Sequence, residues 1–267
     1  MQPKVITLLS DFGLKDPYIA EMKAVVLSKC LEAKIVDISH EIDKFNIRMG
    51  AFVLASAAPY FPKGTVHIAV VDPGVGTKRR PLVVETKYSY FVGPDNGVLM
   101  LAALKETLQH VYVVENPRYM LSEVSKTFHG RDVFAPVAAY LAGGCVASEV
   151  GEEIFDYVVP DFAEPRFKKD VVFGEVLHVD DFGNVITNIP WEILKELAIQ
   201  EGGLVKVEIG GKAVTLRLCS AYGDVSLGKA LAIIGSHNFL EVSVNQGSAA
   251  KQFKAKCGDF VRVQRKS

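Results

Sequence analysis

Between Val5 and about Tyr157, short apolar runs rich in β-branched residues alternate with longer amphipathic stretches. The apolar runs predict strands at residues 5–9, 34–38, 66–71, 82–85, 90–92 and 111–114. The amphipathic stretches predict helices at residues 18–30, 48–57, 98–104 and 132–142. Near-continuous apolar strands between helices are typical of a parallel sheet that is covered on both faces. The pattern therefore predicts an α/β N-terminal domain, with a mostly parallel sheet flanked by helices.

Beyond residue 170 the pattern changes to short strands punctuated by Gly and Asn. The predicted strands cover residues 171–179, 185–188, 203–209, 213–218, 230–234, 240–244 and 259–263. Such a series is typical of a small β-barrel or sandwich. The preceding polar segment contains Pro160 and Pro165, which favours a linker. We predict an α/β catalytic domain at 1–162, a linker at 163–170 and a smaller, all-β, barrel-like domain at 171–267.

Composition narrows the class of protein. The 267 residues, 49% of them hydrophobic, are enough for one large core and a smaller one. The net charge of −1 favours a small-molecule partner over nucleic acid. No apolar run reaches the roughly 18 residues of a membrane span, and the N-terminus lacks the basic start of a signal peptide. The scattered cysteines Cys30, Cys145, Cys219 and Cys257 favour neither a zinc site nor disulfides. We expect a cytoplasmic protein without a membrane partner.

The first candidate for chemistry is Asp72, which a buried-type strand delivers onto a Pro-Gly turn. A carboxylate held there can orient a nucleophile or accept its proton. Arg79 follows seven residues later and can fold back to pair with Asp72 and hold it ionised. The alternative is ordinary turn chemistry, because Asp before Pro also favours a turn.

The second candidate is His129, which lies in a Phe-His-Gly-Arg-Asp run. Gly130 permits a tight turn, and Asp132 is predicted to be the N-cap of the helix that follows. A histidine beside a helix start can donate or shuttle protons. A purely structural histidine is the alternative.

Three aspartates come near the ends of predicted parallel strands, where ligands gather in such sheets: Asp11, Asp37 and Asp72. Asp11 would suit a pair of sugar hydroxyls, although a turn role is the alternative. Taken alone, the three carboxylates also fit a metal-dependent phosphohydrolase. No G-x-G-x-x-G, P-loop or H-E-x-x-H motif is present, which argues against a dehydrogenase, an NTPase or a zincin.

Further polar turns are candidates for ligand contacts. The run at 93–97 combines turn and cap residues, and a structural role is favoured there. The run at 180–184 places an amide beside an aromatic ring, which suits the recognition of a flat base. Ser236, in the run at 236–238, can present its hydroxyl to a polar ligand. A plain β-turn is the alternative for both of these runs.

Together these runs resemble the S-adenosyl-L-methionine (SAM) hydroxide adenosyltransferases, the SAM hydrolases related to the fluorinase and chlorinase enzymes. The matching segments are residues 9–13, 71–79, 93–97, 128–132, 181–184 and 235–236. The resemblance runs through the whole chain in order. It implies an α/β N-terminal domain, a β-barrel C-terminal domain that completes the nucleoside and methionine site, and a homotrimer whose active sites lie between neighbouring subunits.

By this resemblance, Asp72, Arg79 and His129 match the family's Asp-Arg-His catalytic set. Asp11 matches the aspartate that holds the ribose hydroxyls, and Phe45 the aromatic residue that packs on the nucleoside. The implied ligands are SAM, adenosine and L-methionine.

The resemblance also assigns contacts in the second domain. Phe182 and Asn184 match adenosine-binding positions, and Asp180 and Ser236 match methionine-binding positions. The backbone around Val244 matches the contact to the adenine edge.

The chain departs from the halogenating relatives in three places. His237 stands where they have an arginine, Asp72 where they have no carboxylate, and their extra loop after residues 72–79 is missing. An ionised Asp72 would repel a halide but accept a hydrogen bond from water. Water in line with C5′ of SAM would give adenosine and L-methionine, and the sulfonium leaving group requires neither metal nor cofactor. A SAM-dependent halogenase and a non-catalytic adenosine- or SAM-binding protein are the alternatives.

Overall fold

The computed structural model describes residues 4–266 and divides into two compact units, Met1–Pro160 and Asp161–Ser267. The first unit is a mixed sheet covered by helices, and the second is a closed barrel. This confirms the predicted fold class. The short strand β7 (Arg166–Lys168) lies in the segment that composition assigned to a linker.

The sheet of the first unit has the strand order β2-β1-β3-β5-β4-β6. Its strands are β1 (Val5–Ser10), β2 (Lys34–Ser39), β3 (Val66–Val70), β4 (Pro81–Thr86), β5 (Tyr90–Pro94) and β6 (Leu108–Val113). β2, β1, β3 and β5 pair in parallel, whereas β4 is antiparallel to both of its neighbours. β4 reverses because only the short turn after Thr86 joins it to β5, and a parallel pair needs a long crossover.

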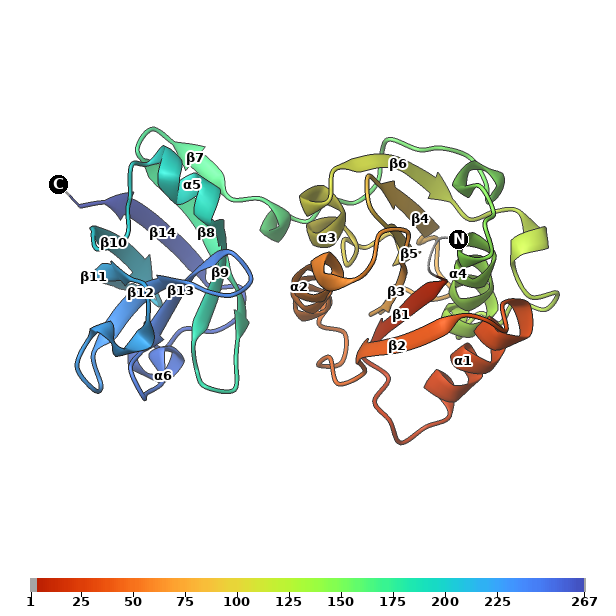
Figure 1. Ribbon diagram of the computed structural model, residues 1–267, viewed down its shortest axis with the longest axis horizontal. Helices are drawn as coiled ribbons and strands as arrows, with labels where there is room; N and C mark the ends of the chain where they lie inside the picture. Colours follow the sequence, from red (N-terminus) through yellow and green to blue (C-terminus); the bar gives the residue numbers. More distant parts are fainter. Residues whose placement is uncertain (1–3, 267) are drawn as a thin grey trace. The chain divides into compact units, whose positions relative to one another are not determined.

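Helices cover both faces of this sheet (Figure 1). α1 (Tyr18–Lys29) and α4 (Ala135–Ala142) pack together on one face, and α2 (Ile47–Ala57) and α3 (Met100–Lys105) on the other. As a result every residue of β3 is buried, which explains its unbroken apolar run.

The strand order reverses at β1, because β2 lies on one side of it and β3 on the other. Ser10 at the end of β1 pairs with Val70 at the end of β3. Asp11 and Asp72 therefore leave neighbouring strands at the same edge of the sheet. Ligands bind at this kind of edge in open α/β sheets.

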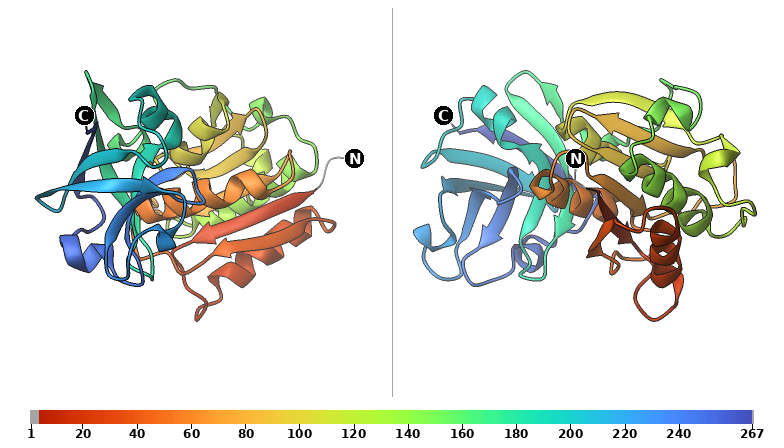
Figure 2. Two further views of the ribbon diagram at one scale, coloured as in Figure 1. Left: turned by 60° about the vertical axis from the view of Figure 1, so that its left-hand side comes forward. Right: turned by 45° about the vertical axis from the view of Figure 1, so that its right-hand side comes forward.

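The strands of the second unit form a ring, because the sheet order β14-β10-β11-β12-β13-β9-β8 is closed by pairing of β14 with β8 (Figure 2). β7 pairs with the first residues of β8. The strands are β8 (Val171–Val179), β9 (Val185–Pro190), β10 (Leu204–Ile209), β11 (Lys212–Cys219), β12 (Ala230–Ile234), β13 (Phe239–Val244) and β14 (Phe260–Arg265). This closure makes the unit a barrel rather than a sandwich. The short helices α5 (Trp191–Glu196) and α6 (Ala249–Phe253) were not predicted, because each is too short to show a helical period.

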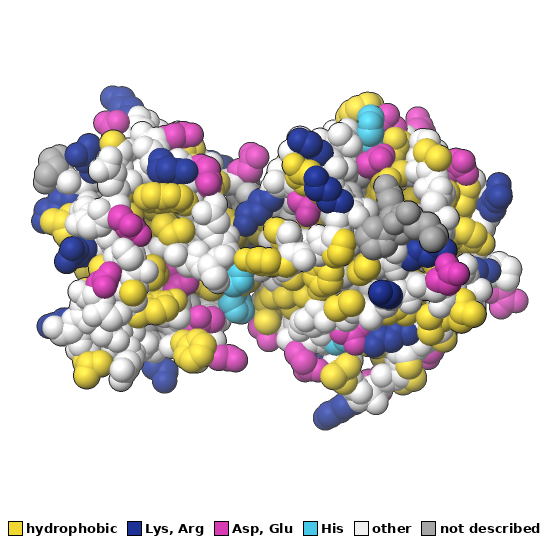
Figure 3. All heavy atoms as spheres, viewed as in Figure 1, with side chains coloured by type: hydrophobic (Ala, Val, Ile, Leu, Met, Phe, Trp, Pro, Cys, Tyr) yellow, Lys and Arg dark blue, Asp and Glu magenta, His cyan; other side chains and the backbone are white. Residues whose placement is uncertain are grey.

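Surface charge is mixed. On the face shown in Figure 3, basic and acidic side chains are interspersed and form no continuous basic field. In the described part of the chain no helix is long and apolar enough to cross a membrane. Nor do residues 4–266 contain a group of three or more His, Cys, Asp or Glu side chains placed to hold a metal ion.

His67, on β3, is a titratable group inside the core of the first unit. It is fully buried, its Nδ1 lies 2.8 Å from Thr7 Oγ1, and its ring stacks on Phe91 with centroids 5.0 Å apart. Its Nε2 has no hydrogen-bond partner among the described residues. Burial lowers the pKa of His67 from 6.5 to about 3.

This shift predicts acid destabilisation of the first unit. The unfolded chain binds a proton at His67 below about pH 6.5 and the folded chain does not, so stability is complete above that pH and falls below it. Between pH 7 and pH 5 the free energy of unfolding should lose about 2 kcal/mol through this residue, and His67→Phe should lack that loss. Denaturant titrations followed by circular dichroism measure it, while Trp191 fluorescence follows the barrel as a control. An equal pH dependence in both proteins would contradict the prediction.

Candidate active site

An ion pair between Asp72 and Arg79 lies in the loop that follows β3. Arg79 Nε donates to Asp72 Oδ1 at 3.2 Å, and Nη2 donates to Oδ2. The side chains of Asp72 and Arg79 are only 4% and 7% exposed. The loop can fold back in this way because Thr77 Oγ1 donates to Gly74 O at 2.7 Å and also accepts from Arg79 N. The pairing that the seven-residue spacing suggested is therefore present.

His129 joins this pair from a segment 50 residues away. Its Nδ1 lies 3.1 Å from Arg79 Nη2. An arginine can only donate, so Nδ1 must be the acceptor and the neutral ring carries its hydrogen on Nε2. Burial, and then the charge of Arg79, lower the pKa of His129 below its usual value, against the opposing effect of Asp72 and Asp132. The site therefore holds a neutral histidine beside an ionic pair.

Close packing joins the two loops that carry these residues. Gly76 has φ +74°, and a Cβ at this position would overlap the carbonyl oxygen of Lys126. Only glycine permits this approach at this backbone conformation. On the other side, the guanidinium of Arg79 lies 5.5 Å from the ring centroid of Phe134. Arg79 is thus held between Asp72, His129 and an aromatic ring.

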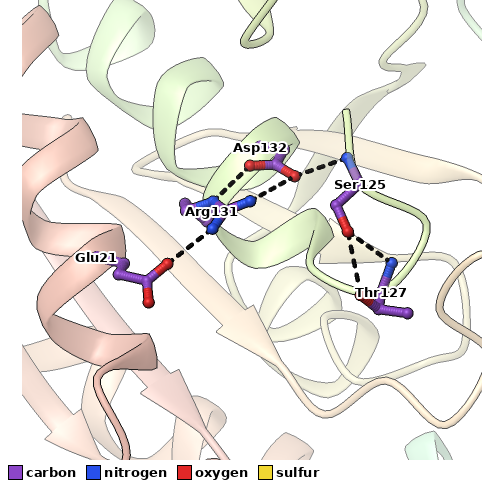
Figure 4. Close-up of polar contacts among 5 residues, drawn as sticks. All are labelled: Glu21, Ser125, Thr127, Arg131 and Asp132. Carbon is purple, nitrogen blue, oxygen red and sulfur yellow. Dashed lines mark hydrogen bonds and ion pairs between the residues drawn. The ribbon is translucent and has the colours of Figure 1, made fainter. Parts of the chain in front are cut away.

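A second polar cluster fixes the loop before His129 (Figure 4). Arg131 donates to Glu21 of α1 at 2.8 Å and to the neighbouring Asp132 at 2.7 Å, and Asp132 also accepts from Ser125 N at 2.8 Å. The prediction that Asp132 is a helix N-cap is wrong. It lies inside a π-helical turn, Gly130–Phe134, that precedes α4, and its carboxylate reaches back to the loop instead.

The turn at residues 93–97 binds the backbone next to Asp72. Asn96 Nδ2 donates to the carbonyl of Val71 at 2.8 Å, immediately before Asp72. Asp95 accepts from Arg80 Nε at 2.8 Å and from Val158 N at 2.8 Å. The structural role favoured for this turn is therefore present. The pattern did not reveal that Asn96 braces the end of the strand that carries Asp72.

The structure also brings Asp11 and Phe45 together, although they are 34 residues apart. Asp11 is 6% exposed, and its Oδ2 accepts from Phe45 N at 2.8 Å. Lys44 Nζ donates to the backbone carbonyl of Asp11. Phe45 is 68% exposed and has φ +65°, a conformation that a bulky residue adopts only when its surroundings impose it. An exposed aromatic ring therefore stands beside a buried carboxylate.

Asp37, the third strand-end aspartate, has different partners. It contacts Lys23 Nζ at 2.6 Å and His40 Nε2 at 3.2 Å. Asp11, Asp37 and Asp72 each have their own hydrogen-bonding partners. The structure thus does not group the three as the ligands of one metal ion.

In the barrel, Asp180, Phe182 and Asn184 share the turn between β8 and β9. Asp180 accepts from the backbone N of Asn184 at 2.8 Å and from its Nδ2 at 2.9 Å. Phe182, at the tip, is 81% exposed. Gly183 has φ +83° and lies so close to Ser248 that a Cβ would overlap the Ser248 side chain. The turn is thus fixed on the start of α6 and exposes one aromatic ring.

The remaining predicted residues lie on β13 and its connections. Ser236 is exposed in the tight turn between β12 and β13, which Gly235 N closes by donating to Phe239 O at 3.0 Å. Val244 ends β13. Because Val242 pairs with Val185, Val244 lies near the 180–184 turn, whereas Ser236 lies at the opposite end of β13. A ligand that touches both must be elongated along the strand.

Both parts of the chain match models of the same protein family. The family model of the SAM hydroxide adenosyltransferase N-terminal domain matches residues 6–151, and that of the C-terminal domain matches residues 174–262. The chain belongs to the SAM hydroxide adenosyltransferase family. The matched regions include every predicted site residue.

Several curated relatives of this family member are named (R)-S-adenosyl-L-methionine hydrolase. The one from Thermus thermophilus is 40% identical, over 97% of this chain and 98% of the relative. The one from Methanocaldococcus jannaschii is 37% identical, over 97% and 95%. A fluorinase from Nocardia brasiliensis is 27% identical, over 97% and 96%. A solved structure of an uncharacterized conserved protein from Thermotoga maritima superposes with a TM-score of 0.87 at 40% identity, covering 97% of this chain and 100% of that one.

The arrangement around His129 predicts its titration. In the unaltered protein its pKa should lie below 6.5 with hydrogen on Nε2. Arg79→Gln should raise that pKa, because the charge of Arg79 is lost while Asp72 stays beside the ring, whereas Arg79→Lys should keep it low. Nitrogen-15 NMR titration measures both the pKa and the tautomer.

His110 is an internal control for this titration, since it lies on β6 and pairs with Glu153. Its midpoint should be the same in all three proteins. A His129 midpoint that stays unchanged in Arg79→Gln would show that Arg79 does not control the ring.

Proposed function

We propose that this chain hydrolyses SAM to adenosine and L-methionine. The observation that carries the proposal is the buried cluster of Asp72, Arg79 and His129 at the ligand-binding edge of the sheet. The hydrolase names of relatives at 34–40% identity over nearly the full chain support it.

The proposed reaction is an in-line displacement. The oxygen of water attacks C5′ while the bond from C5′ to sulfur breaks, and the sulfur keeps the electron pair and becomes the neutral thioether of methionine. The attacking water loses one proton and becomes the 5′-hydroxyl of adenosine. Because the sulfonium is already a good leaving group, the protein mainly has to place the water behind C5′ and hold it there.

Asp72 is the group best suited to receive the proton. His129 Nδ1 accepts from Arg79, and its Nε2 already carries a hydrogen, so the neutral ring has no free lone pair. A carboxylate keeps acceptor capacity even when both oxygens bind an arginine. In this scheme His129 Nε2 donates to the water oxygen, Asp72 accepts a hydrogen of the water, and Arg79 holds Asp72 in place through the ion pair.

We assign the other predicted residues to the two halves of the substrate by the family resemblance. Asp11 binds the ribose hydroxyls, and the exposed ring of Phe45 packs on the nucleoside. The barrel residues Phe182 and Asn184 bind adenosine, and the backbone at Val244 meets the adenine edge. Asp180 and Ser236 bind methionine. We further propose a homotrimer in which the barrel of one subunit completes the site on the α/β unit of its neighbour, without any metal or cofactor.

The negative charge of Asp72 favours hydrolysis over halogenation. A halide that reacts at C5′ must lose its water beside that carbon, and the charge of Asp72 opposes this. Water is neutral and can donate a hydrogen bond to the carboxylate. The lower identity to the fluorinase agrees with this preference.

The first test uses the purified protein and its Asp72→Asn variant. The unaltered protein should convert SAM to equal amounts of adenosine and methionine, with no change when a chelator is added. Asp72→Asn keeps the shape of the side chain but loses its basicity, so kcat should fall about 10²- to 10⁴-fold with little change in KM. Product chromatography and SAM titration measure both. Full turnover by the variant would show that Asp72 is not the proton acceptor.

The second test identifies the nucleophile and the carbon attacked. In water enriched in oxygen-18, the label should enter the 5′-hydroxyl of adenosine and be absent from methionine, as mass spectrometry can show. Fluoride or chloride at high concentration should leave the products unchanged. Formation of 5′-halo-5′-deoxyadenosine would instead establish a halogenase, and tight SAM binding without any product would establish a binding protein.

A further inference from the structure

His40 lies where the loops after β1 and β2 meet. The two strands are parallel neighbours, and Leu9 pairs with Ser39. Ser10 and His40 therefore leave adjacent strand ends side by side. Ser10 Oγ lies 2.8 Å from His40 Nδ1, and the side chain of His40 is only 3% exposed.

The partners of His40 determine its hydrogen positions. Its Nε2 lies 3.2 Å from Asp37 Oδ1, a close electrostatic contact whose angle is outside hydrogen-bond geometry. Burial would raise the pKa of Asp37, but Lys23 and His40 lower it, so Asp37 is ionised. A carboxylate oxygen this close to Nε2 favours the ring hydrogen on Nε2 rather than a bare lone pair, which leaves Nδ1 to accept the Ser10 hydroxyl. Ser10 Oγ in turn accepts from Phe12 N at 3.3 Å.

The backbone of His40 holds the same loop at its other end. The carbonyl of His40 accepts from Gly13 N at 2.8 Å, and Gly13 has φ +71°. The ring and the carbonyl of His40 thus fix both sides of Asp11. Lys44 and Phe45, which bind the backbone and the carboxylate of Asp11, follow His40 in the chain.

Ser10, His40 and Asp37 have the residue types of a hydrolytic triad, but they do not form one. Ser10 is 1% exposed, so its hydroxyl cannot reach a substrate. Its hydrogen bonds are directed at the loop and at His40. The arrangement holds a loop in place and supplies no nucleophile.

We infer that His40 is a positioning residue for substrate binding: through Ser10 Oγ and Gly13 N it sets the carboxylate of Asp11 and the neighbouring Phe45 for the ribose of the nucleoside. This inference rests on the proposed function, because it takes Asp11 to be the ribose contact. It assigns to His40 an effect on affinity and not on the chemical step, since Asp72, Arg79 and His129 lie on other loops.

Two variants of His40 separate the contacts of its ring. The amide of His40→Asn reaches the position of Nδ1 and can still accept from Ser10, whereas that of His40→Gln reaches toward Asp37. His40→Gln should raise KM for SAM and weaken adenosine binding by about 10- to 30-fold, with kcat within about threefold of the original. His40→Asn should restore KM to within about threefold. Steady-state kinetics and calorimetric titration with adenosine measure these values.

Ser10→Ala and His110→Asn complete the set. Ser10→Ala removes the partner of the ring and should reproduce the KM effect, so it decides the question if His40→Gln fails to fold. His110→Asn changes an exposed histidine on β6 and should alter neither constant. Unchanged KM in Ser10→Ala, or a fall in kcat at constant KM in His40→Gln, would overturn the inference. If the unaltered protein releases no adenosine from SAM, the proposed function fails, and the adenosine titrations alone then decide the role of His40.

Discussion

A buried negative charge at the end of β3 is the constraint on which the rest of the site depends. A carboxylate that is 4% exposed is costly unless it is paired, and Arg79 supplies the pair through two hydrogen bonds. The same guanidinium leaves His129 Nδ1 only an acceptor role, which keeps that ring neutral. One arginine therefore pairs with the carboxylate and sets the tautomer of the histidine.

The surrounding fold holds this ionic group in a single geometry. Asn96 binds the backbone before Asp72, Gly76 lets the loop approach Lys126, and Asp132 binds the segment before His129 through Ser125 N. None of these contacts touches the reacting atoms. They matter because the reaction depends on the position of the attacking water. Its rate falls when the groups that hold the water move by about 1 Å.

Two positions show how the backbone serves the site. Phe45 is held in a left-handed conformation with its ring exposed, which costs free energy that Asp11 offsets by accepting the Phe45 amide hydrogen. In the barrel, Gly183 permits a tight turn against Ser248, so that Phe182 stands exposed at its tip. In each unit an exposed aromatic ring lies beside a polar group that suits a nucleoside.

Hydrophobic periodicity alone predicted most strands and the longer helices, because apolar spacing reflects burial on one or two faces. The sequence motifs indicated the family. The sequence also suggested the pairing of Asp72 with Arg79, since both lie within one short loop. It could not place α5 and α6, which are too short to show a helical period. It also missed the partner of Asp132, which follows from a π-helical turn that the pattern does not reveal. Likewise only the tertiary structure joined His129 to Arg79, Phe45 to Asp11 and His40 to Ser10, since parallel strands bring together loops that are 30 or more residues apart.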